Sequence, residues 1–166
     1  PNSSISWKYI IMIIMDIEAS GLAKESYPIE IAWQHRYNPK CCDSFLIQPA
    51  CEWTYWDEFA EREIHHIHRS DLSAFGIEVG KAAIRLNTQL SGQHVYSDAP
   101  TYDRQWLRKL FVSAGIDMEF KVMSVFGLIH PAKVQQYHHH YDRTPTTHRA
   151  KDDVEHIISS LNFTAP

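Results

Sequence analysis

The sequence predicts an α/β domain built on one mixed sheet. Three short strand-like segments come first along the chain, and two more alternate with helix-like segments after them. Strands joined by short turns favour antiparallel pairing, whereas strands separated by helices favour parallel pairing. Both kinds of connection occur in this order, so the sheet is expected to combine both strand directions.

The first three strands are expected to form an antiparallel meander. Residues 8–15 are the most apolar run of the chain and have the length and composition of a buried strand. Gly21 and Pro28 mark a turn after this run, and residues 29–33 alternate apolar with other side chains. Residues 43–48 form the third strand, and the short connections between the three segments favour antiparallel pairing.

Helices and strands alternate in the second half of the chain. Residues 80–91, 102–114 and 150–161 each carry apolar side chains at helical spacing. Residues 94–97 and 120–128 have the composition of short strands. The predicted sheet therefore has five strands, and helices flank it.

Two stretches show no clear periodicity. Residues 50–79 are expected to be irregular, with their aromatic side chains packed beneath the segment; a stacking platform for bases is the alternative. Residues 130–151 carry four cations and one acid, with Tyr137 and Tyr141 between them. A solvated loop is the simpler interpretation of this basic stretch, and a path for a single nucleic-acid strand is the alternative.

Length and composition indicate a folded protein with one core. The chain has 166 residues, 44% of them hydrophobic, and shows no repeat or linker, so a single domain over residues 1–166 is expected. The net charge of −4 argues against a protein that coats nucleic acid through its overall charge. Its three cysteines form no disulfide pattern, which favours a reducing, cytoplasmic location. The apolar run near the start is too short to span a membrane.

Four carboxylates and a histidine are candidate site residues. Asp16 and Glu18 follow the apolar strand two residues apart, so their side chains share one face and repel each other unless a cation lies between them. Asp103 and Asp153 lie near the starts of two predicted helices, on the side to be buried. Taken singly, each of these two has a simpler role, because a negative charge suits the first turn of a helix. His148 lies just before the last helix.

These acids fall within three short motifs that recur in a fixed order. The motifs are residues 16–22 (DIEASGL), residues 102–107 (YDRQWL) and residues 148–153 (HRAKDD). Together they resemble the three exonuclease motifs of the DEDDh family, a branch of the ribonuclease H-like 3′–5′ exonucleases. Ala19 and Ser20 stand where that family more often has two threonines. The resemblance implies a ribonuclease H-like fold, with a mixed five-stranded sheet flanked by helices.

The resemblance also implies a metal-dependent 3′–5′ exonuclease that releases nucleoside 5′-monophosphates. The implied ligands of two divalent ions, Mg²⁺ or Mn²⁺, are Asp16, Glu18, Asp103 and Asp153. Such hard ions prefer oxygen ligands, and two of them roughly 3.5–4 Å apart would clamp the attacking and leaving oxygens of phosphodiester hydrolysis. His148 is the implied general base, since a free imidazole titrates at about pH 6.5.

The terminal nucleotide has an implied binding site as well. Gly21 and Leu22 match the family's turn, where backbone groups and an apolar side chain meet that nucleotide, and Arg149 is a further substrate-binding candidate. The expected substrate is single-stranded or short nucleic acid, with RNA favoured over DNA. A homodimer is expected from small members of the family.

Two other classes of function compete with an exonuclease. A ribonuclease H-like module could keep the fold and bind nucleic acid without cleaving it, but the full set of four carboxylates and His148 argues against this. A histidine-rich metal-binding protein is the second alternative, because His138, His139 and His140 are consecutive. Adjacent residues on a regular element cannot all face one ion, so a specific site is not expected there.

Overall fold

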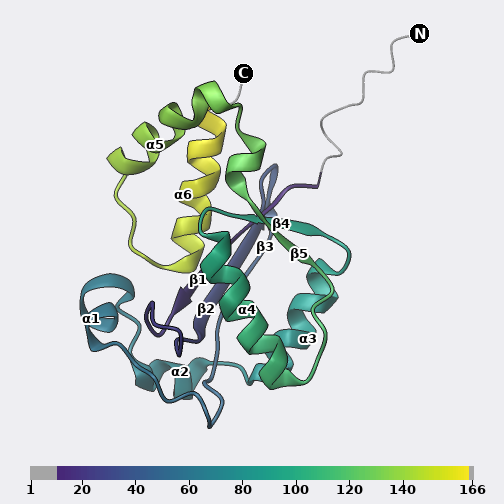
Figure 1. Ribbon diagram of the computed structural model, residues 1–166, viewed down its shortest axis with the longest axis vertical. Helices are drawn as coiled ribbons and strands as arrows, with labels where there is room; N and C mark the ends of the chain where they lie inside the picture. Colours follow the sequence, from purple (N-terminus) through teal and green to yellow (C-terminus); the bar gives the residue numbers. More distant parts are fainter. Residues whose placement is uncertain (1–10, 165–166) are drawn as a thin grey trace.

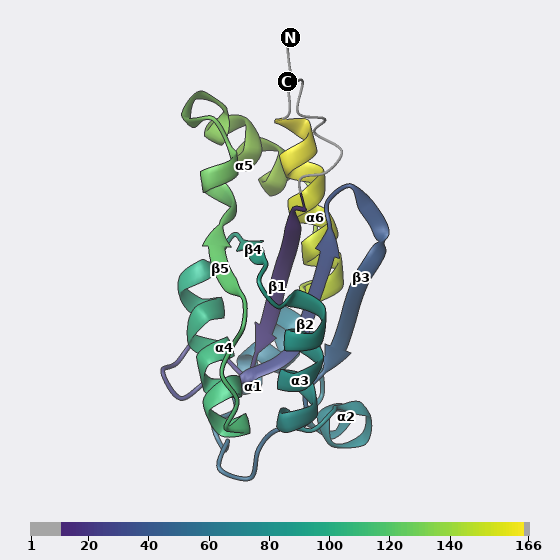
Figure 2. The ribbon, with the colours of Figure 1, turned by 90° about the vertical axis from the view of Figure 1, so that its right-hand side faces the viewer.

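The computed structural model describes residues 11–164 of the chain. A sheet runs through the middle of the molecule, and helices cover both of its faces (Figures 1 and 2). Residues 8–10 of the predicted first strand, residues 8–15, lie outside the described residues, and residues 13–15 belong to β1 (Ile13–Ala19). Within residues 11–164, no helix is long and apolar enough to cross a membrane.

The five strands pair in the order β3-β2-β1-β4-β5, with β1 at the centre. β2 (Pro28–His35) runs antiparallel to β1, and β3 (Asn38–Leu46) runs antiparallel to β2. β4 (His94–Ser97) runs parallel to β1, and β5 (Lys121–Ser124) runs parallel to β4. The predicted α/β class, with an antiparallel meander joined to parallel strands in one sheet, is confirmed.

The two faces of the sheet carry two separate apolar clusters. The longer helices form one pair on each face: α3 (Val79–Leu90) with α4 (Pro100–Ala114), and α5 (Val134–Arg143) with α6 (Ala150–Phe163). Met15 and Ile17 of β1 pack on the face of α3 and α4, whereas Ile14 packs on the face of α6. Because side chains alternate along a strand, Asp16 and Glu18 continue the row of Ile14 and face α6.

The segment before α3 is more regular than the sequence predicts. It contains α1 (Glu58–Ala60), a π-helical turn η2 (Glu61–His65) and α2 (Arg69–Phe75). The prediction of an irregular segment over residues 50–79 is wrong because local caps hold these short turns: the Asp57 carboxylate accepts two backbone N–H groups at the start of α1. Trp53 is buried and stacks on Tyr27, in agreement with the packing interpretation of the aromatic side chains.

The last strand is shorter than predicted. The sequence predicts a strand over residues 120–128, whereas β5 ends at Ser124. The Ser124 hydroxyl accepts a hydrogen bond from the Phe126 N–H and begins a 3₁₀ turn, η3 (Val125–Leu128). This cap ends the strand, and apolar composition alone does not reveal it.

Residues 130–151 are largely helical, so the expectation of a solvated loop is wrong. They contain a 3₁₀ turn, η4 (Pro131–Lys133), followed by α5. Tyr137 of α5 is buried and packs edge-on against Phe126, with ring centroids 5.5 Å apart. Burial of this ring stabilises a helix whose other side chains are mostly polar.

Candidate metal centre

Three carboxylates from two elements meet at the end of β1. Asp16 and Glu18 leave β1 on the face that α6 covers, and Asp153 lies in the first turn of α6. One carboxylate oxygen of each lies within 4.8 Å of the oxygens of the other two. The structure therefore brings three of the predicted metal ligands into one group.

Asp103, the remaining predicted ligand, lies beside this group but outside it. It is 1% exposed in the first turn of α4, and its carboxylate accepts a hydrogen bond from the Ser97 hydroxyl at the end of β4. After burial, repulsion by Asp103 is the strongest influence on the pKa of Asp16. Asp103 thus belongs to the same acidic centre.

Burial is the largest cause of a raised pKa at each predicted ligand, and repulsion by neighbouring acids adds to it. Burial, followed by repulsion from Asp103, holds the pKa of Asp16 well above its usual range. Burial and repulsion by Asp153 raise the pKa of Glu18 to about 9. Burial raises the pKa of Asp103 to about 8 and that of Asp153 to about 6. Burial and neighbouring negative charge both disfavour the ionised form of these carboxyl groups, and a bound cation would offset both effects.

A divalent cation fits this set of donors. Mg²⁺ and Mn²⁺ prefer carboxylate oxygens, and ligands on opposite sides of an ion bound at about 2.1 Å are about 4.2 Å apart. A spacing of at most 4.8 Å among the three carboxylates is compatible with one such ion after small side-chain movements. Arg149, a cation beside Glu18, is already paired with Glu30.

Glu30 anchors the start of α6 beside the four predicted metal ligands, which together are called the metal centre below. Its carboxylate accepts hydrogen bonds from the Arg149 guanidinium at 2.6 and 3.0 Å and from the Ala150 N–H at 3.0 Å. It also lies directly opposite Glu18 in the β1–β2 register, and Arg149 offsets the repulsion between these two acids. The sequence does not reveal this role of Glu30, because its one local sign is an acid between two isoleucines of a predicted strand.

His148 lies in the loop just before α6, and the residue is exposed. It has a positive φ of 52°, and its backbone N–H donates to Thr146 Oγ1 at 3.2 Å. The Thr146 hydroxyl donates in turn to the Asp153 carboxylate. The loop is therefore tied to the metal centre through Thr146. The ring of His148 makes no hydrogen bond to the predicted ligands within the described structure.

The turn that follows β1 packs closely against the segment leading into α1. Gly21 has a φ of +148°, and a Cβ at this position would lie 2.9 Å from Tyr55 Cε1 and from Asp57 Cβ. Leu22 beside it is 70% exposed. An apolar side chain thus projects into solvent three residues beyond the strand that carries Asp16.

Asp98 is a further carboxylate of this centre, and the sequence motifs do not single it out. It directly follows β4, and its repulsion adds to burial in raising the pKa values of Asp16 and Asp153. Its carboxyl group interacts with the Tyr141 hydroxyl. The Tyr141 ring stacks on His156 with centroids 4.1 Å apart, so this contact joins α5 and α6 to the metal centre.

The consecutive histidines point in different directions. His138 and His139 are exposed, whereas His140 faces α6, with its Nδ1 3.0 Å from Ser160 Oγ. Among the described residues, the group whose geometry could hold a metal ion consists of Asp16, Glu18 and Asp153. The structure therefore favours the carboxylates over the histidines as the metal centre.

Comparisons with known proteins identify similar structures but no sequence relative. No family model matches the chain, and no curated protein matches it either. The structure is similar to E. coli exonuclease I in complex with a dA16 oligonucleotide, with a TM-score of 0.71 and 14% identity over 90% of this chain and 40% of that one. Exonuclease I from Methylocaldum szegediense gives a TM-score of 0.69 and 14% identity over 90% and 39% of the two chains.

A smaller nuclease matches over almost its full length. The nuclease domain of 3′hExo, a DEDDh family member bound to rAMP, has a TM-score of 0.63 and 11% identity over 93% of this chain and 92% of that domain. This chain spans about 40% of exonuclease I, so the likeness covers one part of that larger protein. The chain has the fold of DEDDh exonuclease domains, as its three motifs predict.

Proposed function

We propose that this protein is a metal-dependent 3′–5′ exonuclease. The observation that carries the proposal is the group of Asp16, Glu18 and Asp153, whose carboxylates converge within 4.8 Å at the end of the central strand. Acids that repel one another in a partly buried site destabilise a fold, so their convergence favours a function that needs a cation. The fold shared with exonuclease I and 3′hExo supports phosphodiester hydrolysis as that function.

Two divalent ions, Mg²⁺ or Mn²⁺, are the proposed cofactors. Asp16, Glu18 and Asp153 would hold one ion, and Asp16 with Asp103 would hold the other. When bound, such ions supply positive charge that stabilises the attacking and leaving oxygens of a phosphodiester displacement. The hydroxyls of Ser97 and Thr146 orient Asp103 and Asp153, respectively, by hydrogen bonds.

His148 is the proposed general base. It accepts a proton from the attacking water, whose oxygen bonds to phosphorus while the bond from phosphorus to the 3′ oxygen of the preceding nucleotide breaks. A nucleoside 5′-monophosphate leaves, and the 3′ oxygen of the shortened strand takes a proton from solvent to become a hydroxyl. Because His148 is exposed on a loop tied to Asp153 through Thr146, rotation of its side chain is the motion that this role requires.

Single-stranded or short nucleic acid is the proposed substrate, with RNA favoured over DNA. Exonuclease I is bound to a dA16 oligonucleotide and 3′hExo to rAMP, so both sugars occur among the similar structures. Leu22 is exposed and would pack on the terminal base, next to the backbone of Gly21. Arg149 would contact a phosphate through N–H groups that its pairing with Glu30 leaves free. A homodimer and a cytoplasmic location complete the proposal.

Labelled oligonucleotides test this proposal directly. The protein is incubated with a short RNA, or with its DNA counterpart, in the presence of Mg²⁺, Mn²⁺ or EDTA. Stepwise shortening from the 3′ end, with release of 5′-monophosphates that EDTA abolishes, is the expected result. Binding without cleavage would instead identify a nucleic-acid-binding module. Tight Zn²⁺ binding without cleavage would favour a metal-binding protein.

A further inference from the structure

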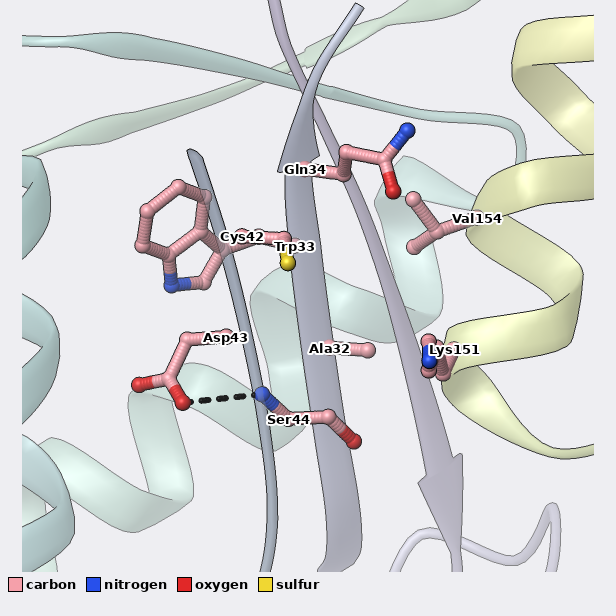
Figure 3. Close-up of a pocket in the computed structure, with 8 residues that line it drawn as sticks. All are labelled: Ala32, Trp33, Gln34, Cys42, Asp43, Ser44, Lys151 and Val154. Carbon is pink, nitrogen blue, oxygen red and sulfur yellow. Dashed lines mark hydrogen bonds between the residues drawn. The ribbon is translucent and has the colours of Figure 1, made fainter. Parts of the chain in front are cut away.

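Glu30 lies on the face of β2 that α6 covers. Ala32 and Gln34, two and four residues further along β2, point toward α6, and Val154 faces them from that helix (Figure 3). Because side chains alternate along a strand, Glu30 points to the same side of the sheet. Its side chain is 6% exposed, and Glu18 lies directly opposite it in the β1–β2 register. A predicted metal ligand and a second acid therefore lie side by side next to the start of α6.

Arg149 is a cation within reach of both acids. Its guanidinium donates to the Glu30 carboxylate at 2.6 and 3.0 Å. Opposite residues of an antiparallel pair have Cβ atoms about 4.5–5.5 Å apart, so a rotation of the long Arg149 side chain is enough to carry its charge from Glu30 to Glu18. Burial raises the pKa of Glu18 most strongly, and the charge of Arg149 opposes this rise. Arg149 thus already acts on a predicted metal ligand.

The carboxylate of Glu30 decides which acid holds Arg149. The Nε and Nη2 groups of Arg149 donate to the two oxygens of this one carboxylate, a forked arrangement that is among the strongest charge-assisted contacts. The Ala150 N–H donates to Glu30 Oε2 at 3.0 Å and fixes the carboxylate for this contact. Glu30 accordingly raises the pKa of Arg149 more than Asp152 or Glu18 does. The fold therefore keeps Arg149 on an acid that is not a predicted ligand.

An arginine on Glu18 would compete with a divalent ion. Asp16, Glu18 and Asp153 each place one carboxylate oxygen within 4.8 Å of the others. A guanidinium bound to Glu18 occupies oxygens that a metal ion needs, and its positive charge repels that ion. The pairing of Arg149 with Glu30 removes this competition.

We propose that Glu30 is a positioning residue that keeps the metal centre open to divalent ions by holding Arg149 away from Glu18. One carboxylate has two separable roles here: the Ala150 N–H needs only an acceptor oxygen, whereas Arg149 needs the negative charge. This inference rests on the metal centre of the proposed function and extends it to a residue that sets metal affinity.

Mn²⁺ binding tests this role without a substrate. Electron paramagnetic resonance measures free Mn²⁺ during titration of the wild type and of Glu30→Gln near neutral pH. Glutamine keeps an amide oxygen for the Ala150 N–H but has no charge for Arg149. The released Arg149 is expected to pair with Glu18 and to raise the Kd for Mn²⁺ about tenfold, in line with the effect of residues that support metal ligands.

A second substitution separates the charge of Glu30 from its anchoring of α6. Glu30→Gln/Arg149→Gln lacks the released cation, so its Kd for Mn²⁺ is expected to return to within about twofold of the wild-type value. Asp152→Asn is the matched control for a general loss of negative charge, because Asp152 is exposed in the first turn of α6. Solvent screens that charge, and a change in Kd of less than about twofold is expected.

Arg149→Gln gives a test that leaves Glu30 unchanged, and circular dichroism checks that each variant is folded. This variant removes the competing cation, so it is expected to bind Mn²⁺ at least as tightly as the wild type. Weaker binding would overturn the proposal, because Arg149 would then assist the metal centre and not compete with the ion.

The other outcomes separate the role of Glu30 from the exonuclease function. Cleavage by the wild type, together with a Kd for Mn²⁺ in Glu30→Gln no higher than in Asp152→Asn, would overturn the role of Glu30 and leave the exonuclease standing. Weak binding that persists in Glu30→Gln/Arg149→Gln would also overturn this role, because Glu30 would then act through the position of α6. The expected Kd values in a protein that cleaves no oligonucleotide would overturn the exonuclease and keep the role of Glu30.

Discussion

Acidic side chains in two regions of the sheet experience opposite electrostatic surroundings. At the metal centre, burial and mutual repulsion raise the pKa values of Asp16 and Glu18. On β3, burial acts on Asp43 in the same direction, but hydrogen bonds led by those of Arg85 outweigh it and lower the pKa of Asp43. On β3 the cation Arg85 binds Asp43 directly, whereas the cation nearest the metal centre, Arg149, binds Glu30.

This difference shows which acidic side chains are neutralised by a partner within the chain. The pair of Asp43 and Arg85 is satisfied within the chain and ties β3 to α3. The carboxylates of the metal centre lack such a partner, because the neighbouring Arg149 binds Glu30. Protons or cations from solvent must therefore stabilise them.

Removal of a metal-centre carboxylate has the largest expected effect. Asp153→Asn should lower the exonuclease rate at least about a hundredfold, because a ligand that holds charge-stabilising ions is lost. Asp152→Asn is the matched control, since Asp152 lies in the same turn of α6 but is exposed, and nearly the wild-type rate is expected. Release of 5′-monophosphates at saturating Mg²⁺ measures both rates. If both variants lose the same amount of activity, then negative charge at the start of α6 matters, and ligation of a metal ion by Asp153 does not.

The stability of the metal-free protein should fall as the pH rises. A carboxyl group whose pKa is raised by folding contributes stability that is fully present below its unfolded pKa and is lost as pH rises through its folded pKa. For Glu18 this window runs from 4.5 to about 9, and for Asp103 from 3.8 to about 8. Urea unfolding in EDTA should therefore show a midpoint that declines across this range.

Divalent metal should reverse this decline. Mg²⁺ or Mn²⁺ binds the ionised carboxylates, so its stabilising effect grows as protons leave them. At a concentration about a hundred times Kd, one bound ion adds about 2.7 kcal/mol to the free energy of unfolding. An unchanged urea midpoint at pH 8 with Mg²⁺ or Mn²⁺ would contradict this prediction. The carboxylates of the metal centre would then be neutralised by cations within the chain, as Asp43 is.

The sequence reveals the residues of the metal centre better than the residues that support them. Asp16 lies at the end of a strand pattern and Asp153 at the start of a helix pattern. The structure places them on β1 and α6, respectively. Glu30 and Arg149 are 119 positions apart, so their pairing depends on which elements are neighbours in space. The role of Asp98 is likewise hidden from the local sequence, because it depends on where α5 and α6 pack.

The segments that were predicted wrongly share a physical cause. A helical period becomes visible only over several turns, whereas residues 50–79 contain short turns held by caps. Residues 130–151 fold around one buried ring, that of Tyr137, in an otherwise polar helix. A single buried side chain leaves no periodic pattern in the sequence.

Breaking the ion pair on β3 should lower stability by a moderate amount. Asp43→Asn is expected to reduce the free energy of unfolding by about 1 kcal/mol, since solvent screens the part of the pair that is exposed. Asp16→Asn should preserve or raise the stability of the metal-free protein, because it removes a charge that its neighbours repel. Urea unfolding in EDTA near neutral pH compares the two variants. A loss in Asp16→Asn as large as that in Asp43→Asn would contradict the distinction between the two regions.

Asp98 is intermediate between the two regions, and the smallest expected effect concerns its partner. Burial raises the pKa of Asp98, while interaction with the Tyr141 hydroxyl opposes this shift. Tyr141→Phe should therefore lower the free energy of unfolding by about 0.5 kcal/mol. Tyr137→Phe is the matched control one turn earlier, because its buried hydroxyl has no partner among the described residues, and its loss should be neutral or stabilising.

Both variants keep the aromatic rings, so the stacking of Tyr137 on Tyr141 and of Tyr141 on His156 is retained. The difference between their unfolding midpoints in urea therefore isolates the contact with Asp98. If Tyr137→Phe costs as much as Tyr141→Phe, the hydroxyl contact does not hold α5 at the metal centre. Ring stacking on α6 would then be the better account of why this helix lies where it does.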